Sequence, residues 1–322
     1  MARFWVSGSI VNNDLNKLRH MDLTGVDGIE LAMYRDLAEV SEAVAWAQGA
    51  GIAYGFHHPL IKDPAFARDL GVQWFALSKE LSSHDRVLRA AALSWVEDSL
   101  ELAHDLGGQH LVVHAPTKIR DLDSPPITED DCRALVTQTL SHLDHLAEKT
   151  GVQILIESDG PNPYYMTPGS LVELVAPYPH LAHCLDTMHF AVFTGKYGYR
   201  CTVEELTVAA APYTASIHLS NTISPSGSGT DLRPPGSQHL RLPVHPDQDP
   251  ADGWIDIQAV VSEVTQQNPD CLLIMEHIPY RDCDLQALAA WGRDPHGYAS
   301  EAIDWVRKLA RGNESDMAGN GL

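Results

Sequence analysis

The sequence predicts an α/β fold, a single closed (β/α)8 barrel with a long insertion after its seventh strand. Three observations favour it: short apolar runs alternate with longer amphipathic stretches along all 322 residues, the runs are nearly free of charge, and there are eight of them. Such strands are buried on both faces, as in a parallel sheet covered by helices. Eight βα units are the number that closes a barrel; a doubly wound open sheet is the alternative.

The predicted strands share a nearly continuous apolar character, and they span 3–7, 28–33, 52–56, 110–113, 152–156, 182–185, 215–219 and 271–275. Amphipathic patterns typical of helices lie between them, among others at 40–50, 87–106, 131–149, 170–176 and 257–267. Several of these helices end just before a glycine that leads into the next strand, as at Gly107 and Gly151. Because a residue without Cβ is favoured after a helix end, these glycines indicate the helix-to-strand boundaries.

Residues 1–311 are predicted to form one domain, since single barrels of this class commonly reach about 250 residues or more. Two segments do not follow the alternation. Segment 220–252 is rich in Ser, Gly, Pro and Asp, and in a barrel a long loop after strand seven would lie over the active face. Residues 312–322 are mostly small or polar and are expected to form a flexible tail.

The charge composition restricts the class of partner. Lys and Arg number 22 against 43 Asp and Glu, a net charge of −21, which argues against nucleic acid or an anionic membrane as a partner. No apolar stretch is long enough to span a membrane, and the first residues do not resemble a secretory signal. The five cysteines are widely spaced and form no CxxC pair, as expected for reduced thiols in the cytoplasm. The expected partner is a small-molecule substrate, with a homodimer as a further expectation.

Six consecutive predicted strands, the third to the eighth, finish with histidine or an acidic residue. These residues are His57 and His58, His114, Glu157, Asp186, His218 and Glu276. In a closed barrel the carboxyl ends of all strands converge on one rim, where active sites are built. The pattern therefore predicts one shared polar site.

Crowded carboxylates repel one another and raise each other's pKa unless a cation neutralises them. Glu157, Asp186, His218 and Glu276 would supply three carboxylates and one imidazole. This set suits Mn²⁺, Mg²⁺ or Co²⁺, with Zn²⁺ as a further candidate. The candidates for additional ligands or substrate contacts are His57, His58, His114, His189 and His239. Taken singly, each of these residues is also explained as a loop cap or as a polar group satisfied in the core.

The motifs GVDGIEL, VVHAP, ILIE, CLDTMHF, SIHLSN and LIMEH occur in this order over roughly residues 3–310. Together they resemble the xylose isomerase-like TIM-barrel superfamily, and most of all its sugar phosphate isomerase/epimerase group, whose relatives include the AP-endonuclease branch. The most specific part is the LDTxH motif of strand six together with the glutamates that end strands five and eight. The resemblance implies metal ligands at Glu157, Asp186, His218 and Glu276, and a substrate-contacting histidine at His189.

The chain departs from this family at two places. Where the family often has a DxH pair after strand seven, the nearest match here is Ser237-Gln238-His239, which lacks the Asp. This difference argues against a complete trinuclear zinc cluster of the endonuclease type. The long, proline-rich segment 220–252 indicates that the cover of the pocket, and so the substrate, differs from that of simple sugar isomerases.

Three functions remain open at this point. The first is a metal-dependent isomerase or epimerase of a sugar, polyol or related hydroxy-ketone, in which Glu157 and Glu276 are the catalytic residues that move a proton through an enediolate. The second is a hydrolase with two or three metal ions that acts on a small phosphodiester or another activated bond rather than on DNA. The third is a barrel that binds a ligand without catalysis.

Overall fold

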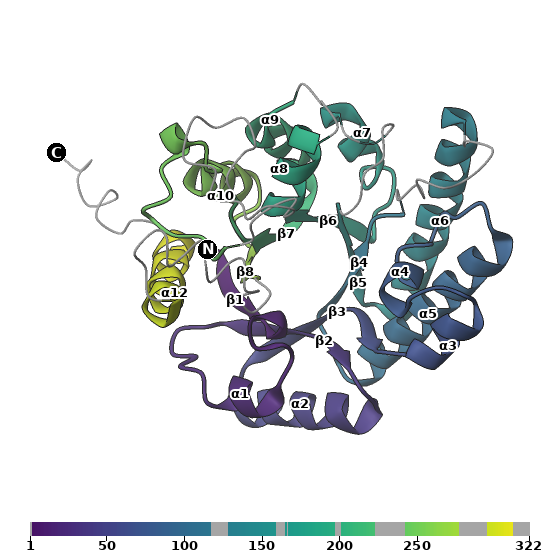
Figure 1. The fold of residues 1–322 in the computed structure, drawn as a ribbon, viewed down its shortest axis with the longest axis horizontal. Helices are drawn as coiled ribbons and strands as arrows, with labels where there is room; N and C mark the ends of the chain where they lie inside the picture. Colours follow the sequence, from purple (N-terminus) through teal and green to yellow (C-terminus); the bar gives the residue numbers. More distant parts are fainter. Residues whose placement is uncertain are drawn as a thin grey trace. The chain divides into compact units, whose positions relative to one another are not determined.

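The computed structural model describes residues 2–116, 128–158, 165, 167–196, 201–222, 242–276 and 295–311. Its eight strands form a closed barrel in the order β1 to β8. The predicted (β/α)8 fold is therefore confirmed, and the doubly wound open sheet is excluded. The chain divides into two compact units, Met1–Gly28 with Asp186–Leu322 and Ile29–Leu185, which are described separately below (Figure 1). That residues 1–311 form one domain stays a prediction.

The Ile29–Leu185 unit is built on the strands β2 (Gly28–Tyr34), β3 (Ala53–Ile61), β4 (His110–His114), β5 (Gln153–Glu157) and β6 (Leu181–Asp186). Strands β3 to β6 pair in parallel with their neighbours, and the β4–β5 register runs from His110 opposite Gln153 to His114 opposite Glu157. Every residue of β4 and β6 is buried. The continuous apolar runs of the sequence therefore correspond to strands whose side chains are buried on both faces of the sheet.

The helices of this unit are α2 (Leu37–Gly49), α3 (Pro64–Asp69), α4 (Trp74–Leu77), α5 (Arg86–Asp105), α6 (Glu129–Thr150) and α7 (Pro168–Glu173). Side-chain caps define where they begin: Asp85 accepts hydrogen bonds at the start of α5, and Thr128 does so at the start of α6. Helix α6 ends at Gly151 in the left-handed conformation, as the sequence predicts. Helices α5 and α6 lie side by side, with α5 against β3 and β4 and α6 against β5 (Figure 1).

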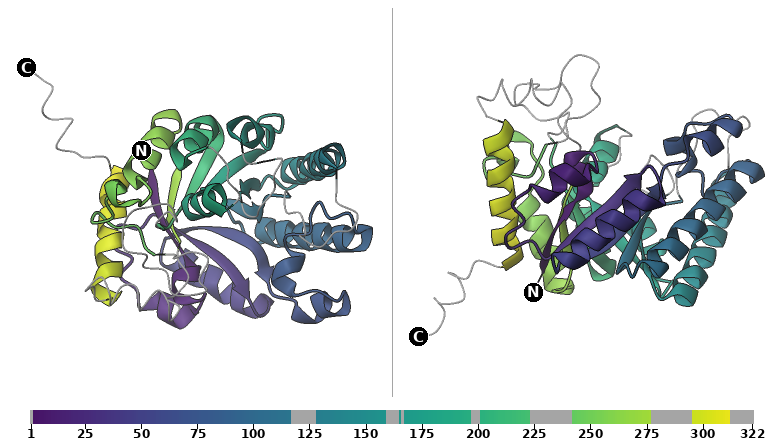
Figure 2. Two further views of the ribbon diagram at one scale, coloured as in Figure 1. Left: turned by 45° about the horizontal axis from the view of Figure 1, so that its top comes forward. Right: turned by 90° about the horizontal axis from the view of Figure 1, so that it is seen from below.

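The other unit contains the strands β1 (Arg3–Ser7), β7 (Thr214–Leu219) and β8 (Leu272–Met275), with β8 paired in parallel to both of its neighbours. Its helices are α1 (Leu15–Arg19), α8 (Thr187–Lys196), α9 (Val203–Ala210), α10 (Ile257–Gln267) and α12 (Pro295–Arg311), with short 3₁₀ turns at Gly8–Val11, Ala211–Tyr213 and Pro250–Asp252. Figure 2 shows α12, in yellow, alongside β1 and β8, and α9 packs on α10.

The predicted strands match the observed ones within a few residues, except that β3 continues to Ile61 instead of ending at residue 56. The predicted helix ranges do not include α1, α3, α4, α8, α9 or α12. Of the predicted insertion 220–252, residues 223–241 lie outside the described residues, and Asn221 and Leu242 on either side form an antiparallel bridge. The predicted tail, 312–322, also lies outside them. None of the described helices has the length and apolarity to cross a membrane.

Gly28, where β2 begins, leaves space for the indole of Trp5. A Cβ at this position would lie 2.1 Å from Trp5 Cε2, and Trp5 is completely buried. We expect Gly28→Ala to lower the free energy of unfolding by about 1–3 kcal/mol, because a fully enclosed ring has nowhere to move. Urea denaturation measures this. Gly49→Ala is the matched control, since a Cβ there meets nothing within 4 Å; equal stability losses in both variants would contradict the packing argument.

His183 on β6 makes the stability of the fold depend on pH. Burial lowers the pKa of its imidazole from 6.5 to about 4, although hydrogen bonds to backbone carbonyls, including that of Leu171 at 2.8 Å from Nε2, oppose the shift. Between these two values the unfolded chain binds a proton at His183 that the folded chain does not. The contribution of His183 to stability is therefore complete above about pH 6.5 and is lost as the pH falls toward 4.

We expect the free energy of unfolding of the wild type to fall more steeply from pH 7.5 to pH 5 than that of His183→Gln. Glutamine keeps an amide donor for the Leu171 carbonyl but cannot be protonated in this range. Urea unfolding at a series of pH values gives the two slopes, and identical slopes would show that His183 does not contribute.

Candidate metal centre

Three buried side chains of the Ile29–Leu185 unit come together at the carboxyl ends of β3, β4 and β5. His57 Nε2 lies 2.9 Å from Glu157 Oε2, and His114 Nε2 lies 3.5 Å from the same oxygen. The two imidazole rings meet edge to face with centroids 5.0 Å apart. Each of these residues offers one ligand atom within 4.8 Å of the others. The three residues can therefore hold a cation between one carboxylate and two imidazoles.

The register of the sheet explains this meeting. His57 stands opposite Val112 on β4, and His114 stands opposite Glu157 on β5. The backbone N–H of Ala115 donates to the carbonyl of Glu157 at 2.7 Å, which extends the ladder by one residue beyond the end of β4. Paired residues of neighbouring strands point to the same side of a sheet, and so do residues two apart on one strand, such as Val112 and His114. The side chains of His57, His114 and Glu157 therefore all point to the same side.

A second buried group lies in the other unit, at the carboxyl ends of β7 and β8 and at Asp186, the last residue of β6, with which that unit resumes. Asp186 and His218 are completely buried, and Glu276 is 9% exposed. His218 Nδ1 lies 3.0 Å from Glu276 Oε2, and the ligand atoms of the three residues lie within 4.8 Å of one another. The backbone N–H of Glu276 donates to the carbonyl of Leu219 at 3.2 Å, so the β7–β8 ladder fixes the position of the glutamate.

The buried carboxylates of this second group require a nearby positive charge. Two carboxylates, Asp186 and Glu276, lie close together away from water, where an uncompensated charge costs several kcal/mol. A divalent cation removes this cost, and the mixture of carboxylate and imidazole donors is one that Mn²⁺, Co²⁺ and Zn²⁺ accept. The residues therefore fit a divalent metal ion, although the donor set does not decide which one.

Two residues outside the predicted ligand set hold this group in place. The buried hydroxyl of Thr187, next to Asp186, donates to the carbonyls of His218 and Ser220 at 3.2 and 2.5 Å, and so ties the start of α8 to the end of β7. Asn221 donates from Nδ2 to Gln248 at 2.8 Å and to the carbonyl of Ile255 at 3.3 Å. Sequence reasoning missed both roles, although the two residues lie inside the LDTMH and IHLSN motifs.

The remaining predicted site histidines are found in different places. His189 lies beside Asp186: its backbone N–H donates to Oδ1 at 2.8 Å, and its Nδ1 is 3.6 Å from Oδ2. His58 points to the other side of β3, where Nδ1 lies 3.0 Å from Ser99 Oγ and the ring contacts Trp95 on α5. Burial, helped by the nearby charge of His57, lowers the pKa of His58 to about 3, so its imidazole is neutral at pH 7. His239 lies outside the described residues.

Comparison with known protein families identifies the family of the chain. The family model described as "Xylose isomerase-like TIM barrel" matches residues 19–309. The chain belongs to this family. The resemblance found in the sequence motifs is thereby confirmed. No curated protein matches the chain.

Among solved structures similar to this member of the xylose isomerase-like family is an L-ribulose 3-epimerase, with 17% identity, a TM-score of 0.64, and coverage of 99% of this chain and 98% of that chain. A 3-keto-D-glucoside 4-epimerase from E. coli has 16% identity and a TM-score of 0.63, with 96% and 100% covered. The IOLI protein, whose structure holds a zinc atom, has 16% identity and a TM-score of 0.60, with 99% of each chain covered. At these identities the likeness establishes the fold.

Proposed function

We propose that this protein is a divalent-metal-dependent epimerase or isomerase of a sugar or related hydroxy-ketone, with Glu157, Asp186, His218 and Glu276 as the metal ligands. The observation that carries the proposal is the buried group of Asp186, His218 and Glu276 at the ends of three consecutive strands. Two carboxylates and an imidazole that are buried together in this way would be stabilised by a shared divalent cation.

Glu157 joins this set through the register of β6. Glu157 stands opposite Cys184, and Asp186 follows two residues later on the same strand. Alternate residues of a strand point to the same side, so the side chain of Asp186 points to the same side of the sheet as those of Cys184 and Glu157. Because the eight strands close in sequence order, the carboxyl ends of β5 to β8 belong to one rim. This supports a single four-ligand centre at that rim.

The two glutamates carry the proposed chemistry. Carboxylates that approach a substrate from β5 and from β8 can act on two faces of one carbon, so one removes a proton and the other returns a proton. When bound, the metal would act as a Lewis acid that stabilises the negative charge developing on the substrate oxygens. His189 and His114 would donate hydrogen bonds to substrate hydroxyls and thereby orient the reacting carbon.

The substrate class is supported by the chemistry that two of the similar structures share. In a ribulose 3-epimerase and in a 3-keto-glucoside 4-epimerase the carbon that changes configuration is next to a ketone. The C–H bond of a hydroxyl-bearing carbon next to a ketone is acidic, because loss of its proton gives a stabilised enediolate. Removal and return of this proton is the step that two opposed carboxylates can catalyse. We therefore favour epimerisation next to a ketone over other reactions of polyols.

The function is tested by solvent exchange. The purified protein with Mn²⁺ is incubated in deuterium oxide with L-ribulose, D-fructose and a 3-keto-glucoside, and proton NMR follows the hydrogen next to the ketone. The proposal predicts loss of this signal and appearance of the epimer for at least one substrate. The absence of exchange with all three compounds, in protein shown to contain metal, would overturn it for this substrate class.

A second candidate function is favoured by the other buried group. His57, His114 and Glu157 could hold a further ion, and clustered ions favour hydrolysis of a phosphodiester or another activated bond. Metal analysis of the purified protein distinguishes the two proposals. About one equivalent per chain supports the epimerase, whereas two or three equivalents, together with hydrolysis of bis(4-nitrophenyl) phosphate, support a small-molecule hydrolase.

A further inference from the structure

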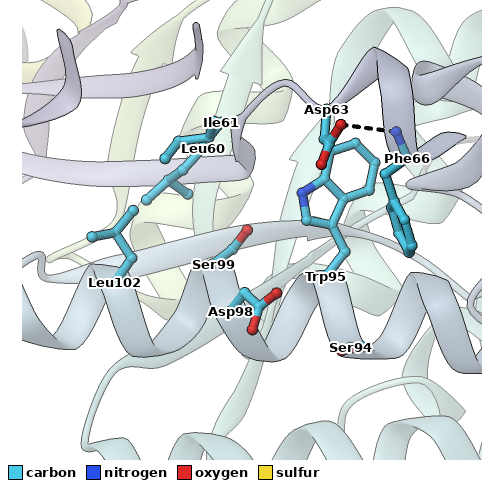
Figure 3. Close-up of a pocket in the computed structure, with 9 residues that line it drawn as sticks. All are labelled: Leu60, Ile61, Asp63, Phe66, Ser94, Trp95, Asp98, Ser99 and Leu102. Carbon is cyan, nitrogen blue, oxygen red and sulfur yellow. Dashed lines mark hydrogen bonds between the residues drawn. The ribbon is translucent and has the colours of Figure 1, made fainter. Parts of the chain in front are cut away.

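A pocket of about 380 Å³ lies in the Ile29–Leu185 unit, between the end of β3, α3 and the middle of α5 (Figure 3). Its apolar lining includes Leu60 and Trp95, which are 1% and 8% exposed, and Leu102. Figure 3 shows Leu60 and Leu102 at one end, and Trp95 with Phe66 at the other. Phe66 is 36% exposed, so this ring stands at the mouth of the pocket. The volume is within the range of about 300–1,000 Å³ typical of sites for small ligands.

The charged groups of this pocket are acidic. Its lining includes Asp63 and Asp98, and none of its described lining residues is Lys or Arg. Asp63 Oδ1 accepts the backbone N–H of Phe66 at 2.9 Å, which fixes the start of α3. Burial raises the pKa of Asp98, and the nearby carboxylates of Glu101 and Glu97 raise it further, which reflects the negative potential of this side of α5. That potential attracts cations and repels anions.

We propose that this pocket is a second binding site, separate from the metal centre, for a small organic cation with an apolar body. The ammonium group would lie at Asp98, an exposed carboxylate of α5 that lines the pocket. The apolar body would pack between Trp95 and Phe66, whose ring faces also favour a cation. Neither an anion nor a purely polar sugar suits a pocket of leucine and aromatic rings with only carboxylates as charged groups.

Contacts connect the pocket to the buried group of His57, His114 and Glu157 in the same unit. Ser99, which lines the pocket, lies with Oγ 3.0 Å from His58 Nδ1, and Trp95 packs edge to face on the His58 ring. His57 Nδ1 lies 2.8 Å from the carbonyl oxygen of His58, and His57 Nε2 lies 2.9 Å from Glu157. A ligand that moves Ser99 or Trp95 would therefore shift His58 and, through it, the position of the His57 ring. This makes the pocket suitable for an effector rather than a substrate.

Three probes with the same 2-phenylethyl body test the site: 2-phenylethylamine, 2-phenylethanol and 3-phenylpropionate, which are cationic, neutral and anionic at pH 7. Calorimetry of the full chain without added metal is expected to detect the amine, with binding of the alcohol weaker by about fivefold or more and no binding of the carboxylate. Asp98→Asn should weaken amine binding by about fivefold, in line with a partly exposed ion pair of ~1 kcal/mol. Phe66→Ala should weaken all binding.

Asp105→Asn is the matched control, because it removes the same charge from the same helix but lies outside the pocket lining and is not among the charges that act on Asp98. Equal losses in Asp98→Asn and Asp105→Asn, equal binding of all three probes, or no binding of the amine would overturn the site. The link to His57 has its own readout: in protein labelled with ¹⁵N-histidine, the amine should shift the His57 ring signal in the wild type and much less in Ser99→Ala. An unmoved signal would overturn the link. Both measurements need no metal, so they are independent of the proposed epimerase activity.

Discussion

Replacing either Glu157 or Glu276 by glutamine is expected to abolish formation of the epimer, with a loss of about 10²–10⁴-fold or more in rate, and replacing the glutamate that removes the proton should also abolish exchange of the substrate hydrogen with solvent. Glutamine keeps the size of the side chain but cannot accept a proton. Each carboxylate is buried and held by a histidine at about 3 Å, His57 for Glu157 and His218 for Glu276, so solvent cannot take over its role. The measurement is deuterium incorporation by proton NMR, with thermal unfolding as a check on folding.

The control for this experiment is Glu204→Gln, which removes an acidic group from the exposed face of α9. Its activity should equal that of the wild type. Exchange that continues in both active-site variants would rule out proton transfer by the two glutamates. Exchange that continues in only one of them, without formation of the epimer, would instead identify that position as the group that returns the proton.

Loss of the metal ligands Asp186 or His218 is expected to have the second largest effect. Both side chains are completely buried, so an Asp186→Asn or His218→Gln variant cannot replace the lost donor with another surface group. Replacing groups that merely support metal ligands typically lowers metal affinity by about 10–100-fold, and loss of a ligand itself should cost at least as much. Titration with Mn²⁺ followed by calorimetry measures the change.

If the metal is needed for catalysis, a chelator should inactivate the wild type. Dialysis against EDTA should remove the activity, and Mn²⁺ or Co²⁺ should restore it, whereas the Asp186→Asn variant should need far more metal for the same rate. An activity that survives chelation, in protein shown by elemental analysis to be free of metal, would contradict a catalytic role for the ion.

The strands and the barrel could be predicted from the sequence because their signal is local. A parallel strand that is buried on both faces is an uninterrupted apolar run, and its end is marked by the first polar side chain. The runs that end at Glu157, Asp186 and Glu276 show this pattern, and all three carboxylates are found at or just after strand ends. Closure in sequence order then accounts for the meeting of residues far apart in the chain.

Other features depend on contacts that a single sequence does not encode locally. His57 and His58 are adjacent, yet one faces Glu157 and the other faces Ser99 on α5; the alternation of a strand separates them, and it applies only because β3 continues to Ile61. The hydroxyl of Thr187 supports the end of β7 through two carbonyls, a role that depends on tertiary structure. The pocket between α3 and α5 likewise depends on tertiary structure, because it is lined by residues of β3, α3 and α5, and α5 packs against β3.

Anomalous scattering from crystals grown with Mn²⁺ would show whether Glu157, Asp186, His218 and Glu276 bind one divalent cation. We expect a single strong anomalous peak per chain, at about 2.0–2.4 Å from an oxygen of each carboxylate and from a nitrogen of His218. A peak bound elsewhere, or protein that takes up no ion at millimolar Mn²⁺, would contradict it.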